Sequence, residues 1–60
     1  KIIDSEFVTF ESNVNWIRVV ILCDTSADIP EPESNWDTGS ICRVANEKKT
    51  LVLNNKREWV

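Results

Sequence analysis

The side chains of this chain that could take part in chemistry are mainly carboxylates. Four of them share one proline-containing segment: Asp24, Asp28, Glu31 and Glu33. Paired carboxylates can act as general acid and base when a dry pocket shifts the pKa of one of them. This loop offers too little surrounding protein for such a pocket, and the chain contains no His for Ser-His-Asp or Cys-His catalysis. We therefore predict no catalytic residue and a protein that is not an enzyme.

The same segment partly matches a calcium-binding loop. Within residues 24–35, oxygen-bearing side chains occupy positions 1, 3 and 5, as in an EF-hand. Position 6 is Ile29 where an EF-hand requires Gly, and position 12 is Asn35 where it requires Glu. An EF-hand is therefore excluded and a weak cation site stays open, while Gly39, the single glycine, cannot form a Gly-rich phosphate loop. We expect no metal centre, no cofactor and no small-molecule substrate.

The two cysteines, Cys23 and Cys42, both lie in strongly apolar surroundings. Free cysteine behaves as a small buried hydrophobe, so a pair of buried thiols is the favoured interpretation. A disulfide that encloses about 20 residues is the alternative, and it would stabilise the fold by roughly 3 kcal/mol. Tetrahedral zinc needs four ligands, so one chain could supply only half of a site shared by two copies.

Charge is distributed unevenly along the chain. The net charge is −3, but residues 1–40 carry −6 and residues 41–60 carry +3. The basic turns at 46–49 and 54–57 contain no aromatic residue, so we expect no nucleic-acid binding. The opposed charges suit docking between copies or onto an oppositely charged partner, although solvated basic turns are the simpler explanation. The longest apolar run, residues 19–23, is far shorter than the ~20 residues of a membrane helix, so no membrane partner is expected.

The composition favours strands over helices, because 17 residues are β-branched. The strongest strand prediction covers residues 16–23, where nearly every position is apolar. Residues 24–40 are predicted to form a long loop that Ile29 and Trp36 attach to the body. Residues 1–13 fit either a helix or a strand, and we favour the strand. Three further short strands, joined by polar turns, are predicted at 41–45, 50–53 and 58–60.

These elements predict an all-β fold in a single domain: a small antiparallel meander of 4–5 strands that forms a compact sheet or a partial barrel. One face of the strand at 16–23 carries Ile17, Val19, Ile21 and Cys23, and the other carries Trp16, Arg18, Val20 and Leu22. A chain of 60 residues can hardly cover both faces, so we predict self-association through the second. The predicted contact residues are Trp16, Arg18, Val20, Leu22 and Trp59.

The C-terminal half of the chain resembles a known pattern. Asp28-Ile29-Pro30, Gly39-Ser40 before a strand, and Leu53-Asn54 with Glu58-Trp59 after it are similar to a run in small head- or tail-associated proteins of tailed bacteriophages. The similarity covers roughly residues 24–60. It implies a β-rich protein without an active site that acts in virion assembly or decoration, in the virion or the bacterial cytoplasm. It also implies that Gly39, Asn54 and Trp59 define the fold, and Gly39 is expected to take a positive φ before its strand.

Two functional hypotheses follow. The first is a non-enzymatic phage- or prophage-type structural or assembly protein that self-associates through a β-strand face, with a second copy or another structural protein as its partner. The alternative is a monomeric adaptor or inhibitor that binds a protein partner through the acidic loop 24–38. The residues predicted for that second contact are Asp24, Asp28, Glu31, Glu33 and Trp36.

Overall fold

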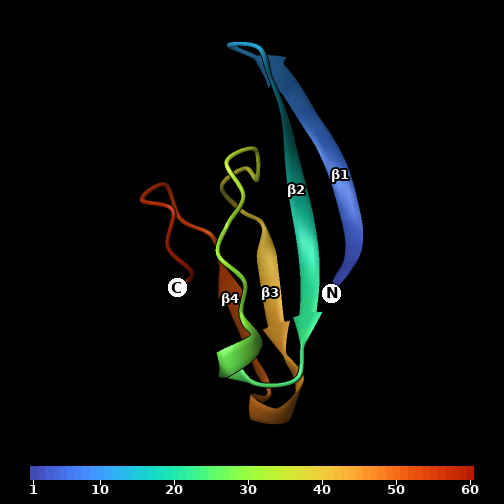
Figure 1. Cartoon of the computed structure of the whole chain (residues 1–60), viewed down its shortest axis with the longest axis vertical. Coiled ribbons are helices and arrows are strands. Elements are labelled where there is room, and N and C mark those ends of the chain that lie inside the picture. The colour runs from blue at the N-terminus through green and yellow to red at the C-terminus, as the bar shows by residue number, and fades with distance from the viewer.

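One β-sheet organises the chain (Figure 1). The computed structural model covers residues 1–60 and contains β1 (Ile2–Glu11), β2 (Val14–Cys23), β3 (Ile41–Val44) and β4 (Lys49–Val52), in that order across the sheet. Two short 3₁₀ helices, η1 (Ser26–Asp28) and η2 (Ala45–Glu47), lie in the connections. The predicted all-β, mostly antiparallel fold is confirmed, and the sheet is open at both edges instead of closing into a barrel.

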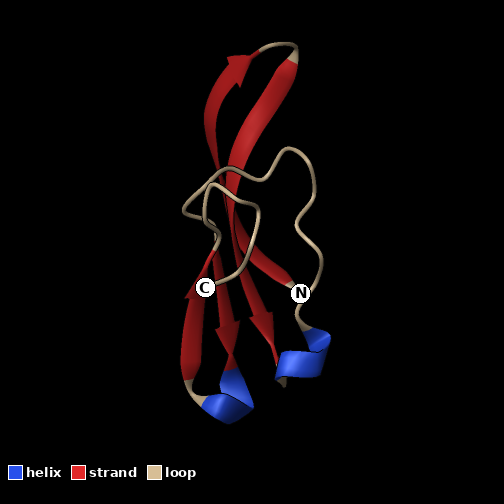
Figure 2. Ribbon diagram, turned by 90° about the vertical axis from the view of Figure 1, so that its left-hand side faces the viewer, coloured by secondary structure: helices blue, strands red, loops and turns tan.

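β1 and β2 form a long antiparallel hairpin whose end extends beyond the rest of the molecule (Figures 1 and 2). Its turn consists of Ser12 and Asn13, with φ of 53° and 62°. Two central residues in the left-handed region are typical of a type I′ turn, whose twist matches that of the strands, and Asn adopts this region readily. The ambiguous residues 1–13 are thus largely a strand, as we favoured.

β2 and β3 are parallel, whereas a simple meander would have paired them antiparallel. Parallel neighbours need a crossover of roughly a dozen residues or more, because the chain must return to the end of the sheet from which it came. Residues 24–40 supply a crossover of 17 residues. The length of this loop was therefore the sequence signal for parallel pairing. β3 and β4 pair antiparallel, as expected.

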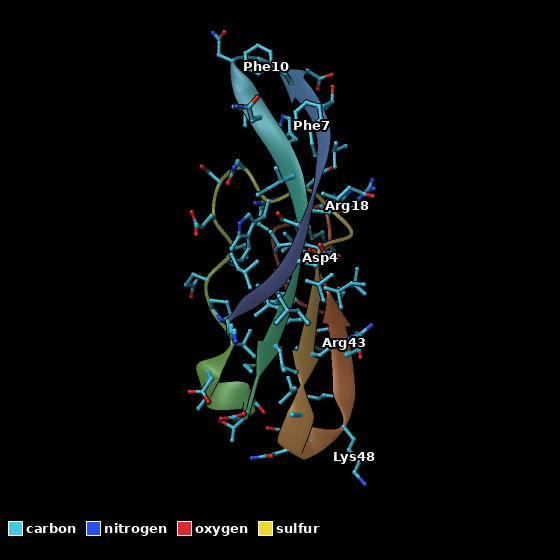
Figure 3. All side chains as sticks on the ribbon, turned by 90° about the vertical axis from the view of Figure 1, so that its right-hand side faces the viewer. Asp4, Phe7, Phe10, Arg18, Arg43 and Lys48 are labelled. Carbon is cyan, nitrogen blue, oxygen red and sulfur yellow. The ribbon has the colours of Figure 1, made fainter.

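The hydrophobic core lies on one face of the sheet. Loop 24–40 and segment 53–60 pass over that face, in front of the strands in Figure 2 and behind them in the opposite view of Figure 3. The predicted inward face of β2 is confirmed, because Val19, Ile21 and Cys23 are buried and Ile17 packs against them. The buried apolar residues are Val19, Ile21, Cys23, Trp36, Cys42, Val44 and Leu53.

The loop is attached to the sheet at several points. Trp36 forms a parallel bridge with Ile17 of β2 and is only 4% exposed. Ile29 packs against the core, so both predicted attachment residues are confirmed. Arg57, which the sequence analysis did not single out, donates from its guanidinium to the backbone oxygens of Trp36 and Glu33, at 2.5 and 2.7 Å. The crossover is thus fastened both to β2 and to the C-terminal segment.

Candidate functional site

The second face of the sheet carries no covering layer, and we call it the open face. Residues that pair across neighbouring strands point to the same side, so the register defines this face. Leu22 and Val52 are 41% and 42% exposed on it, and Val20 and Ile41 are half-buried. The open face includes Asp4, Glu6 and Thr9 from β1, Trp16, Arg18, Val20 and Leu22 from β2, Ile41 and Arg43 from β3, and Thr50 and Val52 from β4.

An apolar row crosses the open face at right angles to the strands. Val20 pairs with Ile41, and Ile41 pairs with Val52. Val52 in turn exchanges two backbone hydrogen bonds with Val60, at 2.8 and 2.9 Å. Leu22 extends the row along β2. Three of the predicted contact residues, Val20, Leu22 and Arg18, therefore belong to one continuous and accessible surface.

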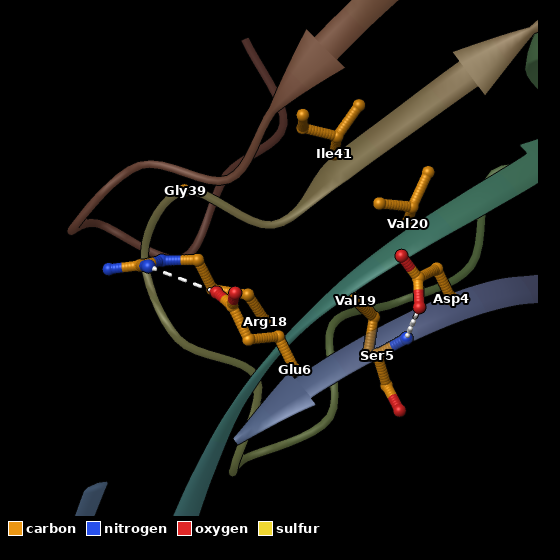
Figure 4. A pocket seen from close by; sticks show the side chains of 8 residues that line it. All are labelled: Asp4, Ser5, Glu6, Arg18, Val19, Val20, Gly39 and Ile41. Atoms are coloured by element: carbon orange, nitrogen blue, oxygen red, sulfur yellow. Dashed lines mark hydrogen bonds and ion pairs between the residues drawn. The ribbon is translucent and has the colours of Figure 1, made fainter. Parts of the chain in front are cut away.

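A hollow of about 230 Å³ opens on this face between β1, β2 and β3 (Figure 4). Val20 and Ile41 form its apolar side, and Arg18 lies at its rim. The Arg18 guanidinium is 3.5 Å from the Glu6 carboxylate (Nη1–Oε1) and 3.9 Å from that of Asp37 (Nη2–Oδ2). Half-exposed ion pairs of this kind contribute little stability each. Their effect here is to hold the guanidinium in place beside the hollow.

Gly39 and Ser40 connect the crossover to β3 underneath this hollow. Gly39 has a φ of 98°, which confirms the predicted positive φ, and a Cβ there would approach Arg18 Nε to 3.2 Å. The Ser40 side chain is fully buried. Its Oγ donates to the Asp37 carbonyl at 2.8 Å and accepts from the Val19 N–H at 3.1 Å. Ser40 therefore supplies a ladder hydrogen bond at the point where the pairing of β3 with β2 begins.

Trp59 does not lie on the open face, which corrects its assignment to the self-association surface. It forms a bridge with Leu53, whose side chain is buried in the core, so both residues point to the covered side. There the indole meets Trp36 edge-on, with ring centroids 6.3 Å apart, and its Nε1 donates to the Pro30 carbonyl at 2.9 Å. Trp59 packs the crossover against the sheet and does not share a surface with Trp16.

The turn that leads the chain back over the core is built around Asn54. Its Oδ1 accepts hydrogen bonds from the backbone N–H groups of Lys56 and Glu58, at 3.0 and 2.9 Å. Its own N–H donates to the Glu58 carbonyl at 2.9 Å. Asn54 thus occupies a turn-forming position, in keeping with the structural role implied for it.

The acidic loop presents its carboxylates separately. Asp24, Asp28, Glu31 and Glu33 are all exposed, and no group of three or more His, Cys, Asp or Glu side chains in the chain could hold a metal ion. Trp36 is buried, which corrects its assignment to a partner-binding surface on this loop. The physical reason is that its large apolar ring is better stabilised in the core than in water. The four carboxylates remain accessible to a protein partner.

The two cysteines are free thiols side by side in the core, as favoured. Their Sγ atoms are 3.7 Å apart, and Cys23 also lies 3.6 Å from the Arg43 carbonyl oxygen. Burial, followed by the contact with the Cys23 thiol, raises the pKa of Cys42 to about 11. A thiol with a raised pKa, such as that of Cys42, is a poor nucleophile and a poor metal ligand, and both cysteines are buried, so this pair packs the core.

Glu47, in η2, is a structural residue that the sequence analysis did not identify. Its carboxylate accepts hydrogen bonds from the Ser26 N–H at 2.8 Å and from the Ser26 hydroxyl, and Lys49 Nζ lies 3.0 Å away. These bonds, with those from Ser26 contributing most, lower the pKa of Glu47 to about 2. The two residues are 21 positions apart, so no local pattern could have indicated their contact.

Comparison of the chain with protein-family models, with curated proteins and with solved structures finds no match. The chain also has no helix with the length and apolar character needed to cross a membrane. Any statement of function therefore depends on the surface of the molecule itself.

Proposed function

We propose that this protein is a non-enzymatic structural subunit that self-associates through the open face. The observation that carries the proposal is the uncovered apolar row of Val20, Ile41 and Val52, joined by Leu22 along β2. Apolar side chains on both faces of a sheet favour a second layer over each face, and this chain supplies one layer. A second copy is the occupant that we propose for the other face.

Charge and size both favour a second copy. The open face carries Asp4 and Glu6 along β1 and Arg43 on the other side of the apolar row. Because the face carries charges of both signs, two copies can meet on it without a net repulsion. The molecule measures 37 by 22 Å in its two longer dimensions, so an interface of the standard ~800 Å² per partner would occupy all of this side.

The exposed edge of β1 is a poorer place for association than the face. Two bulges interrupt the pairing of β1, between Ile2 and Asp4 and between Phe7 and Thr9. Bulges and charged side chains are the usual means by which edge strands avoid pairing with other chains. The similarity of the C-terminal motifs to small virion proteins suggests a phage-type assembly as the setting.

The test is the mass of the protein in solution, measured by size-exclusion chromatography with light scattering over a range of micromolar concentrations. We expect a mass above the 6.9 kDa of one chain, increasing with concentration. The double variant Leu22→Glu/Val52→Glu should remain monomeric and folded. The matched control Ala27→Glu, at an exposed site in η1, should associate like the original protein. A strict monomer at tens of micromolar overturns the proposal.

The adaptor hypothesis would then take its place, and it has its own test. Replacing Asp28, Glu31 and Glu33 together by the corresponding amides should abolish capture of a protein partner without changing the fold. Asp28 lines a hollow together with Leu22 of the open face, so the variant that should leave self-association unchanged is the one that spares it, Glu31→Gln/Glu33→Gln at two exposed positions.

A further inference from the structure

The fold brings its two thiol groups together in the core. Cys23 is the last residue of β2 and Cys42 lies in β3, and these strands are parallel neighbours (Figure 1). Cys42 pairs with Ile21 and Cys23 pairs with Val44, so the cysteines are diagonal neighbours on the covered face. Their Sγ atoms are 3.7 Å apart, although the residues are 19 positions apart in the sequence.

This separation needs only a small movement to become a covalent bond. The sulfurs of a disulfide are about 2.05 Å apart, so the two Sγ atoms must approach each other by roughly 1.7 Å. Diagonal neighbours are farther apart than direct pairs, so part of the movement falls on the backbone. Cys23 ends its strand, and residues 24 and 25 form a bend after it. The end of β2 can therefore move towards β3 while the ladder behind it stays paired.

The two thiols differ in their access to solvent. Cys42 is fully buried, whereas Cys23 is 6% exposed and lines a surface hollow of about 340 Å³ beside Lys1 and Asp24. A cavity of about 150 Å³ is enough to bind benzene, so this hollow has room for a small organic molecule. Burial and the contact with Cys23 also raise the pKa of Cys42 to about 11. Cys23 is therefore the thiol that a reagent from solvent meets first.

We propose that Cys23 and Cys42 form a reversible disulfide by exchange with a small disulfide that enters the hollow at the end of β2. This site goes beyond the proposed function and does not depend on it, because both cysteines lie on the covered face. The order of reaction follows from the burial of the two residues: Cys23 reacts first, and Cys42 completes the bond from within the core.

The exchange takes place in two balanced steps. The Cys23 thiolate attacks one sulfur of the small disulfide, whose S–S bond breaks, so that a mixed disulfide forms and one thiolate leaves. The Cys42 thiolate then attacks Cys23 Sγ, the mixed disulfide breaks, and a second thiolate leaves. The two leaving thiolates take up the protons of the two protein thiols. The protein is thereby oxidised by two electrons, and the small disulfide is reduced to two thiols.

The bond would fasten the crossover to the sheet. It would close a loop of about 20 residues that contains the whole crossover, and it would link β2 to β3 where their pairing ends. Cross-links of this kind stabilise the folded state chiefly by restricting the unfolded chain. We expect the melting temperature of the oxidised protein to be higher by about 10 °C or more.

Intact-mass spectrometry of the folded protein, incubated with the disulfide of 2-mercaptoethanol, tests the proposal. The product should be a single chain lighter by two hydrogen atoms, with no thiol left to titrate in denaturant. Dithiothreitol should restore both thiols and the original melting temperature. A folded protein that keeps both thiols, that stops at the mixed disulfide, or that links two chains overturns the proposal.

Two single variants test the order of reaction. Cys42→Ala should stop at a mixed disulfide on Cys23, because no second thiol is present to displace it. Cys23→Ala should react at least about tenfold more slowly, since its remaining thiol is fully buried. Equal rates for the two variants would overturn the assignment of Cys23 as the first thiol to react.

A further measurement needs no substitution, so it decides the matter even where an alanine variant fails to fold. The rate of oxidation of the original protein should stay nearly constant in urea concentrations below the unfolding transition. A rate that rises in step with unfolding would mean that the thiols react only in the unfolded chain, which would overturn the proposal.

Discussion

The two faces of β2 show how differently neighbouring residues of one strand can behave. Ile21 is 1% exposed, whereas Leu22, the next residue, is 41% exposed. Both are large and apolar, and both lie in the centre of the sheet. The difference arises from what lies over them: the crossover and the C-terminal segment cover Ile21, and nothing in the chain covers Leu22. Coverage, and not residue type, decides which face is the core.

The covered face holds the buried core of the fold. Its core consists of seven buried apolar residues, and fully burying one such side chain contributes roughly 1.5–3 kcal/mol. Small domains are stable by only about 5–15 kcal/mol, so each of these residues accounts for a large share. The open face, by contrast, can be altered with little loss of stability but with a direct effect on association.

Substitution of the two neighbours on β2 tests this comparison with the largest expected effect. Ile21→Ala should lower the free energy of unfolding by about 2–5 kcal/mol, because it leaves a cavity in the core. Leu22→Ala should lower it by less than about 1 kcal/mol and should weaken self-association. Urea denaturation of both variants measures the difference. Equal losses of stability would mean that the two faces are buried alike.

The second prediction concerns the hydrogen bond that joins the crossover to β2. Ser40→Ala removes the acceptor of the buried Val19 N–H, and an unsatisfied buried donor costs about 1–3 kcal/mol. Ser34→Ala, at an exposed position in the same loop, is the matched control and should change stability by no more than about 0.5 kcal/mol. Chemical denaturation of both variants provides the measurement. Similar values for the two would contradict the role given to Ser40.

A smaller effect is expected from Gly39→Ala, which should lower the stability of the fold and also move the Arg18 side chain on the open face. A residue with a Cβ at φ 98° is strained, at a cost of roughly 1–2 kcal/mol. The new Cβ would also press on Arg18 Nε from 3.2 Å and displace the guanidinium from the hollow. Thermal denaturation should report the strain, and light scattering should report weaker association. Thr38→Ala, at the preceding exposed position, should affect neither.

The smallest effect concerns pH and does not involve the open face. The pKa of Glu47 is lowered in the folded protein from 4.5 to about 2, so the carboxylate stabilises the fold above about pH 4.5. That contribution is lost as the pH falls towards 2. The Glu47→Gln variant should therefore melt at a lower temperature than the original protein at neutral pH. The melting temperatures of the two proteins should converge near pH 2. Thermal melts at a series of pH values test this, and parallel curves would disprove it.

Much of the fold could be predicted from local pattern. The apolar run at 16–23 indicated a central strand with two apolar faces, and residues such as Asn13, Gly39 and Asn54 occur where turns require them. The parallel pairing of β2 and β3 was missed, because strand patterns do not encode direction. The long crossover was the only signal for it.

The candidate site was predicted less completely than the fold. Arg18, Val20 and Leu22 were placed on one face from strand alternation alone, because side chains of alternate residues point to opposite sides. Trp36 and Trp59 were assigned to surfaces although both pack on the covered side. Their positions depend on how the crossover and the C-terminal segment fold back, which involves contacts such as that of Trp59 with Pro30, 29 residues apart in sequence.

The sequence by itself determined the strands, the turns and the two-sided apolar character of β2, because these depend on neighbouring residues and on a period of two. Only the tertiary structure decided which of the two faces became the core and which aromatic rings were buried. It also decided where a hollow formed and that the end of the β1–β2 hairpin extends beyond the rest of the molecule. Those outcomes depend on segments distant in sequence, whose packing is set by the shape of the whole sheet and the length of chain available to cover it.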